Sequence, residues 1–243
     1  HLEKQTPYIP PRIWKYQISR LKECISDFTI HKDKIFKCYD FCVNAYIKNY
    51  GSFEAMYFGQ KTSEKNPFSK PTYRGKQTGR KFYGEFEDTA EKFGILNLLK
   101  KWLREDDSEY SKIGVTSLTS YINRVSKVSL AYILNLTLMR ISEGESLRAD
   151  CLVVENDPKF EKFYLIKART TKTINDDSAL WPTSPEAVVA IEAMKSIAML
   201  QRECRRKNPL ILIDDDEYNN PHLIYRSGEP WANINFSHLN VRP

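Results

Sequence analysis

The sequence predicts an α+β protein that is mostly α-helical, with a small antiparallel β-sheet in its second half. Apolar residues recur three to four positions apart through much of the first half, which is the spacing of a helix that buries one face. The second half holds three short runs of strand-forming residues separated by polar turns. These patterns predict a helical domain over residues 1–110 and a second domain over residues 111–243, joined at the acidic stretch 105–109.

Three helices are expected in the first domain. The first begins at Pro11, because proline is favoured in the first turn of a helix, and its apolar face starts with Trp14 and Ile18. Apolar residues at helical spacing predict the second helix over 32–49 and the third over 89–104.

The second domain is expected to mix helices with the sheet. A helix near 117–125 is followed by a strongly apolar helix that starts at Leu130 and ends in Arg140. Ser184 and Pro185 form the start signal of a later helix that runs to about Arg206. The remaining expected elements are strands at 152–155, 163–167, 179–182 and 210–213, an acidic loop at 214–217 and a helix at 233–239.

Composition indicates a folded soluble protein, with 41% hydrophobic and 28% charged residues. No apolar stretch is long enough to span a membrane, because Asn135 and Thr137 interrupt the best candidate. The five cysteines lack CxxC spacing, and Cys38 and Cys42 lie one helical turn apart, where a place in the core is favoured over metal binding. We therefore expect a reducing, cytoplasmic setting, with no metal, no cofactor and no contact with a membrane.

Positive charge is concentrated in the N-terminal third. Residues 1–81 hold 16 Lys and Arg against 7 Asp and Glu, although the net charge of the chain is only +6. Between 61 and 81 the only acid is Glu64, and proline and glycine residues disfavour a helix. Such a segment suits either an arm that contacts a nucleic-acid backbone or a solvated loop whose charges serve solubility. Its basic residues, the candidates for DNA binding, are Lys61, Lys65, Lys70, Arg74, Lys76, Arg80 and Lys81.

Arg140 and a later polar turn form the most informative pattern. An arginine at the end of an apolar helix needs an anion or a carboxylate nearby, and Glu143 follows three residues later on the same helical face. The turn Thr171-Lys172-Thr173 joins two expected strands and so places a lysine at a hairpin tip. These groups suit the binding of a phosphodiester. The alternatives are a structural Arg–Glu pair and a solvated lysine.

The block MRISEGESLRADCL, from Met139 to Leu152, and the Lys172 hairpin resemble the tyrosine recombinases, or phage-type integrases. The resemblance covers 117–243, and the basic first domain resembles in character the core-binding domain with which these enzymes close around DNA. In the family pattern Thr-Gly-Leu-Arg leads into the first catalytic arginine, whereas here Leu138 takes the place of the glycine. The resemblance implies site-specific strand exchange for a phage or another mobile element, by a homotetramer on double-stranded DNA and with no small-molecule substrate.

The resemblance also implies roles for individual residues. Arg140 would neutralise charge on the nonbridging oxygens of the scissile phosphate, Glu143 would hold Arg140 in orientation, and Lys172 would protonate the departing 5′ oxygen. A nucleophilic tyrosine would form a 3′-phosphotyrosine intermediate. Lys167 and Arg169, on the strand before the turn, are expected to contact phosphates.

The His-x-x-Arg box and the nucleophilic tyrosine of the family are not recognised in this sequence. Residues 240–243 resemble those just before that box, so the chain is interpreted as a catalytic domain that stops upstream of its nucleophile and is inactive alone. One alternative is a DNA-binding regulator or accessory protein on the same scaffold that does not cut DNA. Another is a helical protein-interaction module. A His-x-x-Arg motif followed by a tyrosine in the reading frame beyond Pro243 decides for the enzyme.

Overall fold

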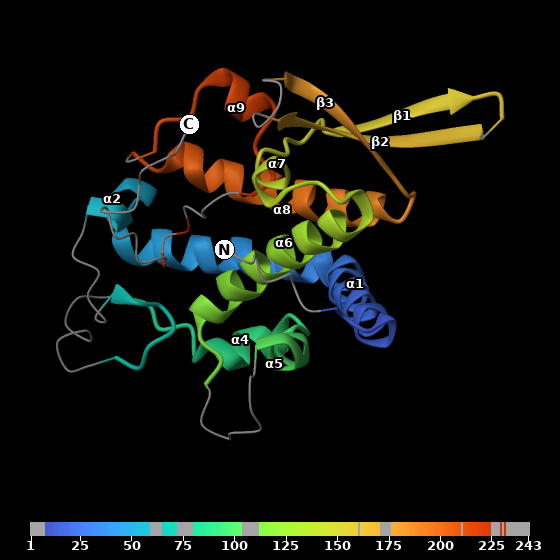
Figure 1. The fold of residues 1–243 in the computed structure, drawn as a ribbon. Coiled ribbons are helices and arrows are strands. Elements are labelled where there is room, and N and C mark those ends of the chain that lie inside the picture. The colour runs from blue at the N-terminus through green and yellow to red at the C-terminus, as the bar shows by residue number, and fades with distance from the viewer. Residues whose placement is uncertain are drawn as a thin grey trace, which may run out of the picture.

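The computed structural model describes residues 8–58, 65–71, 80–103, 112–159, 161–170, 176–209, 211–224, 229 and 231. Over these residues the protein is mostly helical and carries a three-stranded antiparallel sheet (Figure 1), which confirms the predicted α+β class. The elements are α1 (Pro11–Tyr50), α2 (Phe53–Phe58), α4 (Phe86–Lys92), α5 (Leu96–Leu103), α6 (Val115–Thr137), α7 (Ile141–Glu145), β1 (Leu152–Asp157), β2 (Glu161–Thr170), β3 (Asp176–Thr183), α8 (Ala187–Lys207) and α9 (Asp215–Asn219).

Helix α1 is one continuous helix of 40 residues, so the prediction of two separate helices is wrong. The residues between the predicted helices include neither glycine nor proline, and Phe28 continues the buried face across them, so nothing interrupts the backbone hydrogen bonds. Gly51 ends α1 with a φ of 92°, which costs glycine little. Gly94, with a φ of 68°, divides the predicted helix 89–104 into α4 and α5.

In the second half, α6 joins two predicted helices into one of 23 residues. The three strands of the predicted hairpins are confirmed, and in the central strand Ile166 lies opposite Leu152 on β1 and Trp181 on β3. Helix α8 is also confirmed, although it begins at Ala187 rather than directly after Ser184.

The segment before α9 differs from the prediction. Residues 211–213 form no strand, and Leu212 is 99% exposed. The acidic run is a short helix rather than a loop, because the Asp214 carboxylate accepts the backbone N–H of Glu217 at 2.7 Å and so caps α9. The predicted helix at 233–239 lies outside the described residues.

Helices α1, α6 and α8 pack together at the centre of the molecule, and the sheet extends away from them at the upper right of Figure 1. One hydrophobic cluster includes residues from both predicted domains, among them Phe28, Ile122 and Ile197. The predicted boundary at 105–109 lies outside the described residues, and the division into two domains remains a prediction. None of the described helices has the length and apolar character needed to cross a membrane.

Two residues near the C-terminus insert into this core. Trp231 packs edge-on against Tyr39 of α1, with 5.4 Å between ring centroids, and its indole N–H donates to Thr119 of α6. Glu229 is fully buried and accepts a hydrogen bond from the Gln201 side chain of α8 at 3.2 Å. Burial raises the pKa of Glu229 to about 7. All five cysteines are free and buried, which confirms the core placement predicted for Cys38 and Cys42.

Candidate nucleic-acid site

Arg140 lies at the start of α7 and not at the end of the long apolar helix, so its predicted position is wrong. Helix α6 ends at Thr137 because Leu138 adopts a left-handed backbone conformation with a φ of 56°. The buried Met139 follows, and Arg140 is the N-cap of α7. Leu138 thus occupies a conformation that favours glycine, at the position where the recombinase pattern has glycine.

Glu143 binds both the backbone and the side chain of Arg140. Its Oε2 accepts the Arg140 backbone N–H at 2.7 Å, and its Oε1 accepts Nη1 of the guanidinium at 3.0 Å. The Glu143 side chain is 7% exposed, whereas that of Arg140 is 53% exposed. Within the described part of the chain the guanidinium forms no further hydrogen bond, and about half of the Arg140 side chain is exposed.

The charge of Glu143 is maintained by its hydrogen bonds. Burial acts to raise the pKa of this carboxyl, but the hydrogen bonds from Arg140 and Thr170 outweigh burial and hold the pKa below its ordinary value. Glu143 is therefore an anion at neutral pH and can hold a guanidinium in a fixed orientation.

The last residue of β2 binds the same carboxylate. Thr170 Oγ1 donates to Oε1 of Glu143 at 2.9 Å, so this one oxygen receives hydrogen bonds from Thr170 and from Arg140. Lys172 lies outside the described residues, in the segment 171–175 that joins Thr170 to Asp176, the paired ends of β2 and β3. The described structure therefore brings Arg140 and Glu143 to the end of the strand that leads into the predicted lysine turn.

The other two predicted basic residues of β2 differ in their surroundings. Lys167 Nζ pairs with the Asp150 carboxylate at 3.0 Å, and its side chain is 37% exposed. The Arg169 side chain is exposed, and its backbone N–H donates to Ser146 Oγ at 3.0 Å. Arg169 thus lies beside α7, whereas Lys167 belongs to a partly exposed ion pair.

Two lysines of the basic segment, residues 61–81, lie against aromatic rings. Lys65 Nζ is 5.2 Å from the ring centroid of Tyr50, and Lys81 Nζ is 4.9 Å from that of Tyr83. These contacts orient the ammonium groups without neutralising them. The described residues of this segment lie at the lower left of Figure 1, well away from α7, so the basic segment and the Arg140 region are separate surfaces.

Arg80 supports the backbone of the same segment. Its Nη1 donates to the Asn66 carbonyl at 2.9 Å, and its Nη2 donates to the Ser69 carbonyl at 2.7 Å. This guanidinium therefore ties two parts of the basic segment together. The predicted DNA contacts Lys61, Arg74 and Lys76 lie outside the described residues.

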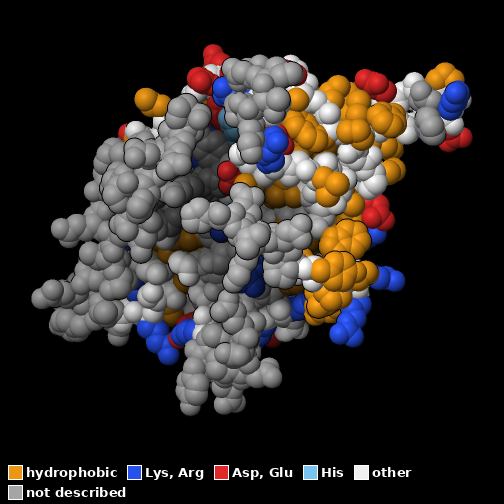
Figure 2. Space-filling view, in the orientation of Figure 1, with side chains coloured by type: hydrophobic (Ala, Val, Ile, Leu, Met, Phe, Trp, Pro, Cys, Tyr) orange, Lys and Arg blue, Asp and Glu red, His pale blue; other side chains and the backbone are white. Residues whose placement is uncertain are grey.

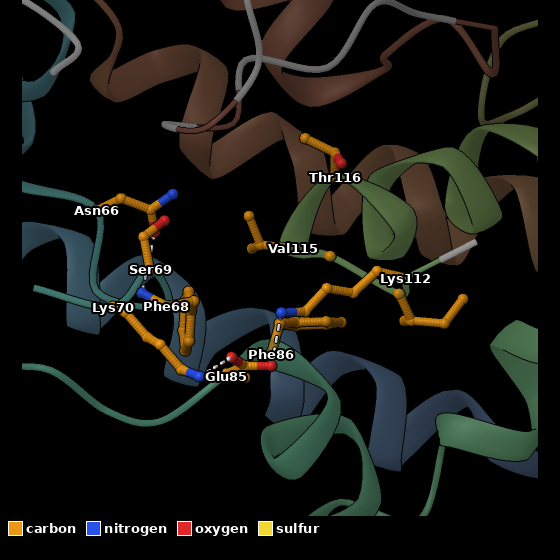
Figure 3. A pocket seen from close by; sticks show the side chains of 11 residues that line it. Asn66, Phe68, Ser69, Lys70, Glu85, Phe86, Lys112, Val115 and Thr116 are labelled. Carbon is orange, nitrogen blue, oxygen red and sulfur yellow. Dashed lines mark hydrogen bonds and ion pairs between the residues drawn. The ribbon is translucent and has the colours of Figure 1, made fainter. Parts of the chain in front are cut away.

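Lys70 lines a pocket of about 540 Å³ (Figure 3). Lys70 and Lys112 extend toward Glu85 and pair with it at 3.4 and 2.6 Å, and the buried rings of Phe68 and Phe86 also line the pocket. Because the two lysines share one carboxylate, this cluster links the basic segment to the start of α6. The Lys70 side chain is still 81% exposed.

Arg148 belongs to an ion-pair network that sequence reasoning missed. Its guanidinium pairs with Asp216 at 2.7 Å, and the neighbouring Glu217 pairs with the buried Arg205 at 3.4 Å. His222 Nδ1 lies 2.6 Å from the Glu217 carboxylate. The acidic run was visible in the sequence, but its partners on distant segments were not. The network joins the chain after α7 to α8 and α9.

Exposed apolar side chains gather over the sheet and the start of α1 (Figure 2). They include Phe163 and Leu180 on the sheet, at 41 and 49% exposure, and Ile13 on α1 at 43%. Trp14 Nε1 donates to Asn135 at 3.1 Å, which holds the start of α1 against the last turn of α6. Because Trp14 is itself 46% exposed, its ring adds apolar surface beside the end of α6.

Comparison with known proteins identifies no relative. No protein-family model matches the chain, and no match was found among curated proteins or among solved structures. In the part of the chain that the structure describes, no group of three or more His, Cys, Asp and Glu residues is arranged to hold a metal ion.

Leu138→Gly is expected to raise the free energy of unfolding by about 1 kcal/mol. A left-handed conformation costs a residue with a Cβ atom about 1–2 kcal/mol, and Leu138 is 88% exposed, so its side chain contributes little packing. Urea denaturation measures the change. Leu138→Ala is the matched control, because alanine keeps the Cβ atom; equal stabilisation by both variants contradicts the assignment of strain to this position.

Proposed function

We propose that this chain is part of a tyrosine recombinase that cuts and rejoins double-stranded DNA through a 3′-phosphotyrosine intermediate. The observation that carries the proposal is the convergence of two sequence blocks on one carboxylate. Glu143 binds Arg140 and also Thr170, which lies 27 residues further along the chain. Thr170 directly precedes the turn that resembles the catalytic-lysine hairpin. The left-handed conformation of Leu138 supports the same assignment.

The half-exposed Arg140 side chain suits the proposed chemistry. Guanidinium is planar, stays charged at any working pH and can donate two parallel hydrogen bonds to the nonbridging oxygens of a phosphate. Negative charge grows on those oxygens as the tyrosine oxygen, whose proton passes to solvent, attacks phosphorus, and a preorganised cation stabilises it. The bond from phosphorus to the 5′ oxygen then breaks, and Lys172 protonates that oxygen.

The enzyme is tested with protein expressed from the complete reading frame. Incubation with nicked duplexes taken from DNA that flanks the gene, followed by denaturation, is expected to yield protein covalently joined to DNA. Mass spectrometry should then locate a phosphotyrosine beyond Pro243. Duplex binding without a covalent product overturns the enzyme and favours the non-cutting regulator. If the protein neither binds the duplex nor forms a covalent product, the result favours the helical protein-interaction module.

Neutralising three lysines of the basic segment, Lys65, Lys70 and Lys81, by substitution with glutamine is expected to weaken duplex binding. Each phosphate contact that is lost should reduce the slope of log K against log salt by about 0.9, because fewer counterions are released. Fluorescence anisotropy with a labelled duplex between about 50 and 200 mM salt measures this slope.

Two variants serve as controls for the lysine substitutions. Lys127→Gln removes an exposed lysine of α6 outside the basic segment and should leave the slope unchanged. Arg80→Ala should instead lower the free energy of unfolding, because the Arg80 guanidinium donates hydrogen bonds to two backbone carbonyls. An unchanged slope in the triple variant contradicts the placement of DNA on the basic segment.

A further inference from the structure

We propose that Thr170 and Ser146 are positioning residues that set the Arg140 guanidinium for the scissile phosphate. This inference rests on the proposed recombinase function and adds to it. It assigns the orientation of Arg140 to two hydroxyl groups that act through Glu143. Through them, the direction of the guanidinium depends on where β2 lies.

Thr170 fixes the carboxylate from the side of the sheet. Oε1 of Glu143 accepts hydrogen bonds from Thr170 Oγ1 at 2.9 Å and from Arg140 Nη1 at 3.0 Å, and Oε2 accepts the Arg140 backbone N–H at 2.7 Å. Glu143 is almost wholly buried, so water does not readily replace a lost donor. Among the described residues, Arg140 alone would hold the plane of the carboxylate if the Thr170 hydroxyl were removed.

Ser146 fixes the backbone of α7 against the same strand. Its Oγ donates to the Glu143 carbonyl at 2.7 Å and accepts the Arg169 backbone N–H at 3.0 Å. The pairing of β2 with β3 shifts register between Ala168 and Thr170, so the strand is irregular where these bonds form. Helix α7 is therefore bonded to two consecutive residues of β2, Arg169 and Thr170.

This bracing matters because α7 is short and follows a strained turn. Five residues, Ile141–Glu145, form too few internal hydrogen bonds to hold an orientation by themselves. Phosphoryl transfer depends on placing the cation at the oxygens where charge develops, and a shift of about 1 Å can cost a hundredfold in rate. The two hydroxyls connect this short helix to the sheet, which is the more extensive element.

The geometry is tested first on the 243-residue chain, without any assay of activity. Spectra of ¹⁵N-arginine-labelled protein, with the Arg140 signal assigned by Arg140→Lys, report the mobility of its guanidinium. Thr170→Val keeps the shape of the side chain and removes the hydroxyl, and is expected to raise that mobility, as is Ser146→Ala. Thr170→Ser should restore the wild-type signal. An unchanged Arg140 signal in Thr170→Val overturns the positioning role.

The second test uses the complete protein and two nicked substrates. One carries the natural phosphate at the cleavage site, and the other carries a methylphosphonate, on which less negative charge must be stabilised. Thr170→Val is expected to slow covalent trapping about tenfold on the phosphate, as for loss of one hydrogen bond to a charged group. On the methylphosphonate the loss should be less than about threefold, because Arg140 has less charge to neutralise.

The two tests separate the positioning role from the proposed function. Equal loss on both substrates means that Thr170 serves only the fold, and it overturns the inference. Ser120→Ala, which removes a hydroxyl at an exposed position of α6, is the control and should behave as wild type in both tests. If wild-type protein forms no covalent DNA, the recombinase proposal fails, while the spectra still decide whether Thr170 and Ser146 orient Arg140.

Discussion

Arg140→Ala is expected to slow covalent trapping of DNA by the complete protein by a factor of about 100 to 1,000. Removing one preorganised donor at a developing oxyanion costs an enzyme about this much. The expected loss of stability is about 1–2 kcal/mol, because the Arg140 side chain is 53% exposed but the Glu143 side chain is 7% exposed and loses one of its donors. Single-turnover trapping and thermal denaturation of the same preparations separate loss of chemistry from loss of fold.

Two further variants sharpen this test. Arg140→Lys keeps a positive charge and loses the planar two-pronged donor, so its rate should fall between those of wild type and Arg140→Ala. Arg12→Ala removes an exposed arginine of α1 and should trap DNA at the wild-type rate. If Arg140→Ala traps DNA within about threefold of wild type, the Arg140–Glu143 pair serves the fold alone.

Glu229→Gln is expected to raise the free energy of unfolding by about 3 kcal/mol at about pH 8 and to have little effect near pH 4.5. Glu229 is fully buried, and burial raises its pKa from the ordinary 4.5 to about 7. Because the folded state holds the proton more tightly than the unfolded state, the stability that this group contributes is complete below pH 4.5. It is lost as the pH rises through 7. Glutamine has the same shape and carries no charge at any of these pH values.

Urea denaturation of wild type and variant across this pH range measures the difference. The comparison isolates Glu229, because carboxyls with a lowered pKa, such as Glu143 and Glu217, are present in both proteins and cancel. Glu192→Gln, which makes the same substitution at an exposed position of α8, is the matched control and should change the free energy of unfolding little. A difference for Glu229→Gln that does not change with pH contradicts the burial of an ionisable carboxyl in this core.

The sequence predicted those features that local patterns determine. The three strands were predictable because short runs of β-branched and aromatic residues alternate with polar turns. The Arg140–Glu143 pair was predictable because residues three apart meet on one helical face, and Glu143 reaches back to the Arg140 backbone N–H as in a capping box. Helix breaks were less predictable. A polar stretch did not interrupt α1, whereas Gly94 divided the helix expected over 89–104.

The contacts that build the candidate site could not be read from the sequence. Thr170 lies 27 positions after Glu143, and no local pattern indicates that its hydroxyl donates a hydrogen bond to the Glu143 carboxylate. Arg148 pairs with Asp216 only because the chain after α8 returns to α7. The left-handed conformation of Leu138 could not be predicted either, because leucine rarely adopts it. This turn ends α6 and so places Arg140 at the start of α7.

The inaccessibility of the five thiols makes the protein well suited to spectroscopic labelling. Burial raises the pKa of Cys24 and Cys151 to about 12 and that of Cys204 to about 11, so the reactive thiolate is scarce at neutral pH. A cysteine introduced at the fully exposed Leu212 should therefore react with a maleimide dye while the native cysteines stay in place. Energy transfer from a dye at residue 212 to a labelled duplex would then test the proposed DNA binding.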